Sequence, residues 1–132
     1  MQYLLDTHVL IYLGCGDTDR IGKRALQIYR NRNSRIFASQ ISFWEMAIKC
    51  DIGKLHIPIG LRNVVTLLRQ AGIETMPVRN AHIFLYESLE RKEEHKDPFD
   101  RYLVATAQCE NLTIVSADEK FDLYSSTVRI WE

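Results

Sequence analysis

The sequence has few cysteines and no cysteine pair. Cys15, Cys50 and Cys109 lie far apart, are odd in number and form no CxxC motif. This spacing argues against both a disulfide framework and a zinc site. We expect all three thiols to be buried as small hydrophobic side chains. A reducing compartment, the cytoplasm, fits this cysteine content best.

The sequence also lacks an excess of either charge. It contains 17 Lys and Arg residues against 17 Asp and Glu residues, which gives a formal net charge of zero. A strongly basic nucleic-acid-binding protein would have a different balance. Any contact with nucleic acid must therefore come from local basic patches.

Long apolar runs are absent as well. No run approaches the ~20 apolar residues that a membrane-spanning helix needs. The first residues, MQYLLDTH, contain no basic segment followed by a long apolar region, so we expect no secretory signal. Membrane proteins and secreted proteins are thus not indicated by this sequence.

The 132 residues contain no low-complexity segment, internal repeat or Pro/Gly-rich linker, so we expect one domain over residues 1–132. Apolar runs predict strands at 2–5, 36–39, 73–78, 112–116 and 128–131. Periodicity and end signals predict helices at 17–32, 42–52, 61–71, 80–89 and 98–110. The segment ERKEEHK, residues 90–96, is expected to be a solvated charged connection. Strands that alternate with helices predict an α/β fold, with a mainly parallel sheet covered on both faces.

Acidic residues follow two of the predicted strands directly. Asp6 comes after the strand at 2–5, and Asp118 follows the strand at 112–116. Sites in open parallel sheets lie outside the carboxyl ends of the strands. If these two strands are parallel neighbours, both carboxylates project from the same edge. The alternatives are that Asp6 caps the helix after Thr7 and that Asp118 is a turn residue.

Two more carboxylates stand at the start of the helix in HKDPFDRYLVATA, residues 95–107. Pro98 suits the first helical position, which makes Asp97 the N-cap and places Asp100 in the first turn. Favourable interaction with the helix dipole would explain Asp100 without any function. However, Val104 and Ala107 follow Asp100 on the same face, so Asp100 heads an apolar, core-facing stripe. Both a structural and a functional role therefore remain open for these two acids.

Glu45 raises the same question in the segment SFWEMAIK, residues 42–49. Ser42 and Glu45 match the S-x-x-E capping box, which is a sufficient structural explanation. Ile48 and Ile52 nevertheless follow Glu45 on one helical face. A carboxylate on such a face is costly unless it is paired or bound to a cation, and Lys49 is an available partner.

The placement of these acids favours a cation site. Carboxylates that converge from different segments repel each other strongly at low dielectric, unless a hard cation neutralises them. Oxygen-only ligation suits Mg²⁺ or Mn²⁺ better than Zn²⁺. Metal sites of this kind orient phosphates and activate water.

Four segments occur in a characteristic order: LLDTH at 4–8, SFWEMAIK at 42–49, HKDPFDRYLVATA at 95–107 and LTIVSADEKF at 112–121. Together they resemble the PIN-domain family. More narrowly, the chain resembles VapC-type toxins of bacterial toxin–antitoxin pairs, in the subgroup with an H-x-D-P-F-D-R motif. The resemblance spans essentially the whole chain. It implies a PIN-like three-layer α/β/α sandwich with a central, mainly parallel sheet.

The resemblance also implies an activity and the residues that carry it. PIN domains cleave RNA by metal-assisted hydrolysis, which here would leave a 5′-phosphate and a 3′-hydroxyl. The implied catalytic acids and ligands of Mg²⁺ or Mn²⁺ are Asp6, Glu45, Asp100 and Asp118. Asp97 is an auxiliary metal ligand or only the N-cap, and Glu119 and Asp122 compete with Asp118 for the last role. Ser116 would support the site by a hydrogen bond.

Partners follow from the same resemblance. We expect an RNA substrate, a cognate antitoxin protein whose C-terminal segment occupies the acidic groove, and a homodimer. The alternatives are a catalytically inactive PIN-like binding module and a phosphatase with Asp6 as nucleophile. The phosphatase is disfavoured because LLDTH lacks the second aspartate two residues further on.

Other polar and aromatic residues allow two interpretations each. The basic run of Arg30, Arg32 and Arg35 is either a solvated helix end or an RNA phosphate contact. Lys49 and Arg101 could contact substrate, or pair with Glu45 and Asp97. We expect His8 and His95 to be orienting or structural, and Trp44 and Phe99 to be core anchors rather than stacking platforms for bases.

Overall fold

The computed structural model describes residues 1–132 and contains one five-stranded sheet. The strands are β1 (Gln2–Leu5), β2 (Arg35–Ser39), β3 (Glu74–Met76), β4 (Thr113–Val115) and β5 (Arg129–Ile130). Their order in the sheet is β3-β2-β1-β4-β5, and every neighbouring pair is parallel. The predicted α/β class and parallel sheet are therefore confirmed.

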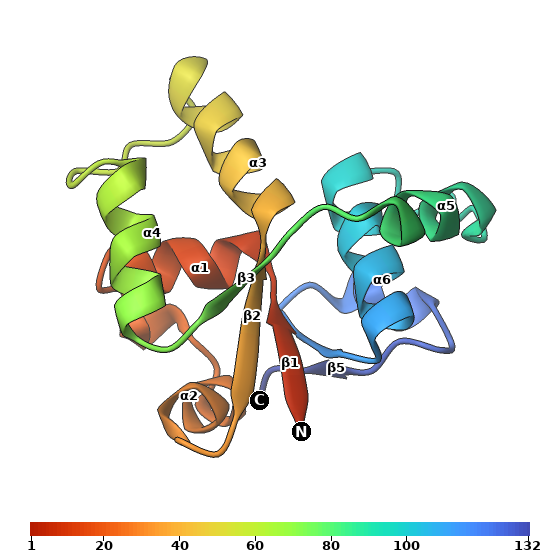
Figure 1. Cartoon of the computed structure of the whole chain (residues 1–132), viewed down its shortest axis with the longest axis horizontal. Coiled ribbons are helices and arrows are strands. Elements are labelled where there is room, and N and C mark those ends of the chain that lie inside the picture. Colours follow the sequence, from red (N-terminus) through yellow and green to blue (C-terminus); the bar gives the residue numbers. More distant parts are fainter.

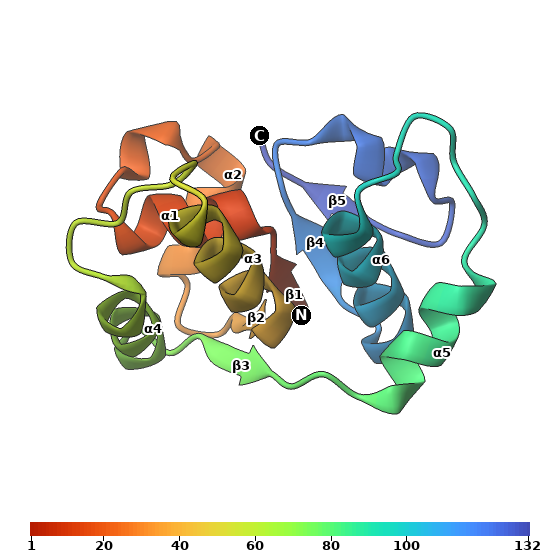
Figure 2. The ribbon, with the colours of Figure 1, turned by 90° about the horizontal axis from the view of Figure 1, so that it is seen from above.

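Helices cover both faces of this sheet (Figure 1). They are α1 (Thr7–Gly14), α2 (Lys23–Arg30), α3 (Gln40–Asp51), α4 (Leu61–Gln70), α5 (Asn80–Ser88) and α6 (Pro98–Glu110), with short 3-10 helices η1 (Thr18–Arg20) and η2 (Glu119–Leu123). Figure 2 shows α1 and α4 on one side of the sheet and α5 and α6 on the other. No helix is long and apolar enough to span a membrane.

The alternation of side chains along the strands builds two cores. Tyr3 and Leu5 point into the core under α1, α2 and α4, together with Val64 of α4. Leu4, between them, points into the opposite core with Leu103 of α6. Successive side chains of a strand face opposite sides, so one apolar run serves both layers.

Three local predictions were wrong. The helix expected at 17–32 is divided into η1 and α2, and the backbone at Gly22 passes so close to the carbonyl of Trp131 that a Cβ would collide with it. Cys15 and Cys109 are exposed, and Cys50 is half-buried, although all three thiols are free. Within the connection at 90–96, which was expected to be solvated, His95 is buried.

Candidate metal centre

The carboxyl ends of β1 and β4 bring Asp6 next to Ser116. Leu5 pairs with Val115 in the parallel register, and the Asp6 N–H donates to the Val115 carbonyl at 3.0 Å. Ser116 Oγ then donates to Asp6 Oδ2 at 2.7 Å. The hydrogen bond that the sequence predicted for Ser116 is therefore present in the structure.

Asp6 is not a helix cap of the ordinary kind. It occupies the N-cap position of α1, but its side chain accepts no hydrogen bond from that helix. Only 4% of the residue is exposed, and Oδ1 is buried without a hydrogen-bond partner. Burial, the largest cause, raises the pKa of Asp6, and nearby Glu45 raises it further, while the Ser116 hydrogen bond lowers it. The capping role does not explain this carboxylate.

Glu45 is also buried, and the predicted capping box is wrong. Helix α3 begins at Gln40, with Ser39 as N-cap, because Ser39 Oγ accepts from the Ile41 N–H at 3.2 Å. Ser42 therefore lies inside the helix, where its Oγ accepts from the Thr7 hydroxyl at 2.8 Å.

Glu45 lies in the second turn of this longer helix, and 5% of it is exposed. Its Oε2 pairs with Lys49 Nζ at 3.0 Å, the pairing that the sequence allowed. Its Oε1 is buried and has no partner. Since a buried charge is costly without compensation, one half of this carboxylate lacks an explanation within the chain.

Helix α6 has the boundaries that the sequence predicted, and its two acids differ in role. Asp97 is the N-cap, since Oδ1 accepts from the N–H groups of Phe99 at 2.8 Å and Asp100 at 3.2 Å. Asp100 is half-buried, with 21% of its side chain exposed. The pKa of Asp100 is raised to about 8. Burial is the largest cause, and it is followed by the negative charges of Asp6, Asp97, Glu45 and Asp118, in that order. The repulsion that the sequence suggested therefore converges on Asp100.

Asp118 completes the group at the start of η2. Its Oδ1 caps that helix at the Lys120 N–H, 3.0 Å away, and its own N–H donates to Ser116 Oγ at 3.0 Å. Of its competitors, Asp122 forms a two-pronged ion pair with Arg129, at 3.0 and 2.9 Å. Glu119 is exposed. Asp118 is thus the acid of this loop that faces Asp100.

His95 is a member of the site that the sequence analysis did not place there. Only 2% of it is exposed, and Nδ1 lies 2.9 Å from the Tyr124 hydroxyl. Nε2 lies 3.4 Å from Asp100 Oδ2 and has no hydrogen-bond partner. His95, Asp100 and Asp118 each offer one atom that could bind a metal ion, and these three atoms lie within 4.8 Å of one another. Burial is the main reason that the pKa of His95 is lowered, which keeps the ring neutral near pH 7.

Two neighbouring residues differ from expectation. Trp44 is 59% exposed rather than a core anchor, and it meets Phe99 edge-on at 5.6 Å between ring centroids. Arg101 does not pair with Asp97, since its guanidinium donates instead to Tyr124 and to the carbonyls of Leu89 and Glu90.

The basic run lies away from the acids. Arg35 begins β2 opposite Gln2, so it stands at the amino edge of the sheet, and it pairs with Glu74 at 2.8 Å. The acids follow the carboxyl ends of the strands. The run therefore does not line the acidic site.

The residues present fit a hard divalent cation. Asp6 Oδ1 and Glu45 Oε1 are buried acceptors without donors, and Asp100 ionises with difficulty in their presence. A cation among these carboxylates would satisfy the free oxygens and remove the repulsion. Oxygen donors of this kind suit Mg²⁺ or Mn²⁺.

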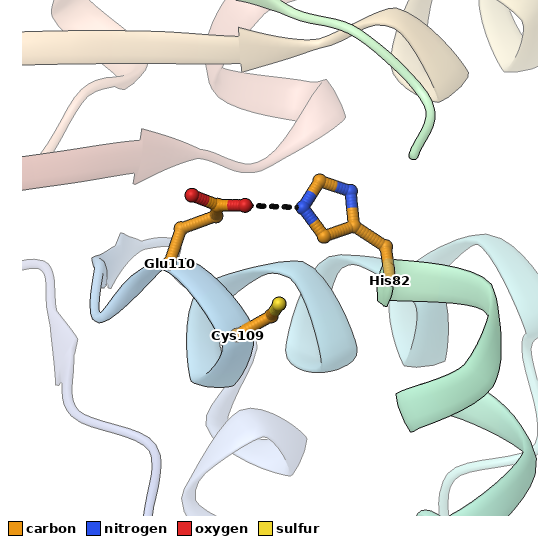
Figure 3. Close-up of side chains that lie close together, drawn as sticks. All are labelled: His82, Cys109 and Glu110. Atoms are coloured by element: carbon orange, nitrogen blue, oxygen red, sulfur yellow. Dashed lines mark hydrogen bonds and ion pairs between the residues drawn. The ribbon is translucent and has the colours of Figure 1, made fainter. Parts of the chain in front are cut away.

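A second cluster lies between α5 and α6, away from this edge. Figure 3 shows the His82 ring facing the Glu110 carboxylate, with Cys109 beside them. His82 Nε2 lies 2.7 Å from Glu110 Oε2, and Nδ1 lies 3.3 Å from the Tyr102 hydroxyl. Both ring nitrogens are engaged, so this cluster is explained as a polar contact that joins two helices.

Comparison with solved structures gives chains of similar fold. One is in VapBC2 from Rickettsia felis, whose structure includes a bound DNA fragment from the VapBC2 promoter. It has 17% identity and a TM-score of 0.69, and the match covers both chains completely. Another is in VapBC-1 from nontypeable Haemophilus influenzae, with 21% identity, a TM-score of 0.70, and 98% and 97% coverage. A third is in VapBC-5 from Mycobacterium tuberculosis, a member of the VapBC family of toxin-antitoxin systems. It has 18% identity and a TM-score of 0.59, and the match covers 98% of this chain and 97% of that chain.

The family follows from a separate comparison. No curated protein matches the sequence. The model of the PIN domain family, however, matches residues 3–126, which is nearly the whole chain. The parallel sheet between helical layers agrees with that match. This chain belongs to the PIN domain family.

Proposed function

We propose that this chain is a metal-dependent endoribonuclease, the toxin of a toxin–antitoxin pair. The observation that carries the proposal is the pair of buried carboxylate oxygens, Asp6 Oδ1 and Glu45 Oε1, that have no donor in the protein. An inactive binding module has no need of such costly groups. The family membership and the fold shared with VapBC chains support the same activity.

The proposed ligands of Mg²⁺ or Mn²⁺ are the oxygens of Asp6, Glu45, Asp100 and Asp118. Such an ion supplies positive charge for the scissile phosphate and lowers the pKa of a water molecule. Ser116 holds Asp6 and the backbone of Asp118, and Lys49 holds the second oxygen of Glu45. The carboxylates of Asp6 and Glu45 are thereby oriented before any ligand arrives, which reduces the cost of reorganisation.

RNA must approach an acidic edge, so cations nearby are needed for its phosphates. Next to His95, a surface hollow of about 510 Å³ is lined by several basic residues, among them Arg91, Lys92 and Lys96. Lys92 and Lys96 pair only with exposed glutamates, Glu90 and Glu93, and such surface pairs are weak. We assign this hollow to the RNA backbone.

The antitoxin is the proposed second partner. The chains of similar fold come from VapBC structures, and one is described as a member of a family of toxin-antitoxin systems. An antitoxin segment over the acidic edge would block access to the carboxylates. A homodimer is part of the proposal because the chain resembles VapC-type toxins, and a cytoplasmic location because its cysteines form no CxxC pair.

The proposal is tested by incubating a mixed RNA pool with the protein and Mg²⁺, Mn²⁺ or EDTA. We expect cleavage that requires the divalent ion, with 5′-phosphate and 3′-hydroxyl ends. Asp6→Asn should remove cleavage and leave a folded protein, because the amide keeps the shape and avoids a buried charge. Asp122→Asn is the matched control, since that acid pairs with Arg129, and it should cleave normally. Cleavage by Asp6→Asn at the wild-type rate would refute the proposal.

A further inference from the structure

Two buried histidines of this chain have the same pair of polar neighbours. His82 and His95 each have a tyrosine hydroxyl at Nδ1 and a carboxylate beside Nε2. The His82 contact with Glu110 is closed at 2.7 Å, as Figure 3 shows, and it lies between two helices. The His95 contact with Asp100 is 3.4 Å long and lies within the acidic site. One arrangement thus serves packing, while the other reaches a proposed metal ligand.

The contacts of Tyr124 favour one tautomer of His95, with the proton on Nε2. Arg101 Nη1 donates to the Tyr124 oxygen at 3.0 Å, because a guanidinium can only donate. The Tyr124 hydroxyl hydrogen is then available for His95 Nδ1, 2.9 Å away. A neutral imidazole that accepts at Nδ1 carries its hydrogen on Nε2. The chain of donors therefore runs from Arg101 through Tyr124 to His95.

Arg101, at the start of this series of hydrogen bonds, is held in place. Arg101 is buried, and its guanidinium also donates to the carbonyls of Glu90 and Leu89, at 3.1 and 3.3 Å. No carboxylate pairs with Arg101, so none draws it away from Tyr124. The segment that directly follows α5 thus holds the donor in place.

At the other end of the series of hydrogen bonds, one ring nitrogen of His95 is free. His95 Nε2 has no hydrogen-bond partner although it is buried. Asp100 Oδ2 lies 3.4 Å away, and a small movement that both shortens and straightens this contact would make a normal hydrogen bond. The edges of the Phe121 and Tyr124 rings confine the imidazole, with centroids at 5.3 and 5.5 Å. His95 Nε2 therefore faces one carboxylate oxygen of the site, without a hydrogen bond between the two atoms.

We propose that His95 is a positioning residue that orients the Asp100 carboxylate through Nε2–H, with its tautomer set by Tyr124 and Arg101. This inference rests on the proposed function, in which Asp100 is a cation ligand. It also means that His95 is not itself a ligand, since a protonated Nε2 has no lone pair to offer. Partners that orient metal ligands change metal affinity or activity by about 10- to 100-fold when they are removed.

The tautomer is tested directly by ¹⁵N NMR of the histidine side chains in the wild-type protein. We expect Nε2 of His95 to be protonated and Nδ1 to be unprotonated, both with EDTA and with saturating Mg²⁺. Tyr124→Phe should turn the His95 signals into those of a tautomer mixture. Tyr102→Phe removes the equivalent hydroxyl beside His82 and should leave His95 unchanged. A proton on Nδ1 in the wild type, or loss of the Nε2 proton on addition of Mg²⁺, would overturn the proposal.

A second test compares His95→Gln with His95→Leu. The glutamine keeps an N–H donor and the leucine does not, while both remove the ring. We expect Mn²⁺ affinity and kcat to fall about 10- to 100-fold in His95→Leu, with KM for RNA little changed, and to recover largely in His95→Gln. His82→Leu is the control, and it should lose thermal stability but keep its Mn²⁺ affinity. Equal Mn²⁺ affinity in the wild type and His95→Leu contradicts the positioning role.

These readouts separate the inference from the proposed function. A wild-type protein that binds Mn²⁺ and cleaves no RNA would refute the ribonuclease. The spectrum and the Mn²⁺ affinities would still decide the role of His95. A wild type that binds no Mn²⁺ refutes both.

Discussion

Ser116 Oγ donates a 2.7 Å hydrogen bond to Asp6 Oδ2 across 110 residues of sequence, and the same hydroxyl accepts from the Asp118 N–H. One small side chain thereby connects the ends of β1 and β4 with the loop that follows. It also occupies one oxygen of Asp6 and leaves the other, Oδ1, buried and free. The geometry of the acidic site thus depends on a neutral residue.

Replacement of this hydroxyl tests that dependence. Ser116→Ala should lower the free energy of unfolding by about 1–3 kcal/mol, because a buried carboxylate oxygen loses its donor. Mn²⁺ affinity should fall about tenfold or more, since Asp6 and Asp118 are no longer held together. Calorimetric titration and chemical denaturation measure the two effects. Thr106→Val is the control: the Thr106 hydroxyl donates to the carbonyl of Tyr102 in the same helix, so Mn²⁺ affinity should be unchanged.

The pKa of Asp100 predicts how stability depends on pH without divalent ions. The unfolded carboxyl ionises near 3.8 and the folded one near 8, so between these values the folded state binds more protons. Stability is therefore fully present below about pH 4 and is lost as pH rises toward 8. The loss by pH 7 is at most roughly 4 kcal/mol. The raised pKa of Asp6 acts in the same direction.

Denaturation in EDTA across this pH range measures the effect. Asp100→Asn cannot ionise at this position, so its stability should vary much less with pH, and saturating Mn²⁺ should abolish the decline in the wild type. Parallel curves for the wild type and Asp100→Asn in EDTA would rule out Asp100 as the focus of the repulsion.

Asp97 can be assigned by two substitutions. Asparagine keeps an oxygen that accepts from the Phe99 and Asp100 N–H groups, whereas alanine removes the cap. We expect Asp97→Asn to retain stability, and Asp97→Ala to lose about 1 kcal/mol. If Asp97 is only the cap, Asp97→Asn also retains Mn²⁺ affinity. A large loss of affinity in Asp97→Asn would instead make Asp97 a ligand.

The sequence was a good guide to the parts of this fold that depend on local pattern. β1 and α6 have the boundaries that apolar runs, Pro98 and Asn111 predicted, and Asn111 adopts the left-handed conformation that ends a helix. The placement of Asp6 past a buried parallel strand also followed from pattern, because strand ends share an edge.

Long-range contacts explain where the sequence was insufficient. The capping box at Ser42 was wrong because Ser39 caps α3, while Thr7, from another element, holds the Ser42 hydroxyl inside the helix. His95 was expected in a solvated segment, yet Tyr124, 29 residues later, holds its ring inside. Trp44 was expected in the core, but its side of α3 is exposed to solvent. Neighbouring residue types do not encode such partners. The one local signal for His95 is that it is a lone histidine among charged residues, directly before the segment that contains Asp97 and Asp100.

The central claim is that the carboxylates together hold a divalent cation, and calorimetric titration with Mn²⁺ near pH 7 tests it most directly. We predict that the wild type binds Mn²⁺ and releases protons, because Asp100 with its pKa of about 8 is largely protonated before the ion arrives. Two buffers of different ionisation enthalpy measure this release. Asp100→Asn should bind Mn²⁺ about tenfold more weakly, or more weakly still, and should release fewer protons. Absence of Mn²⁺ binding by the folded wild type, or equal affinity and proton release in Asp100→Asn, would contradict the claim.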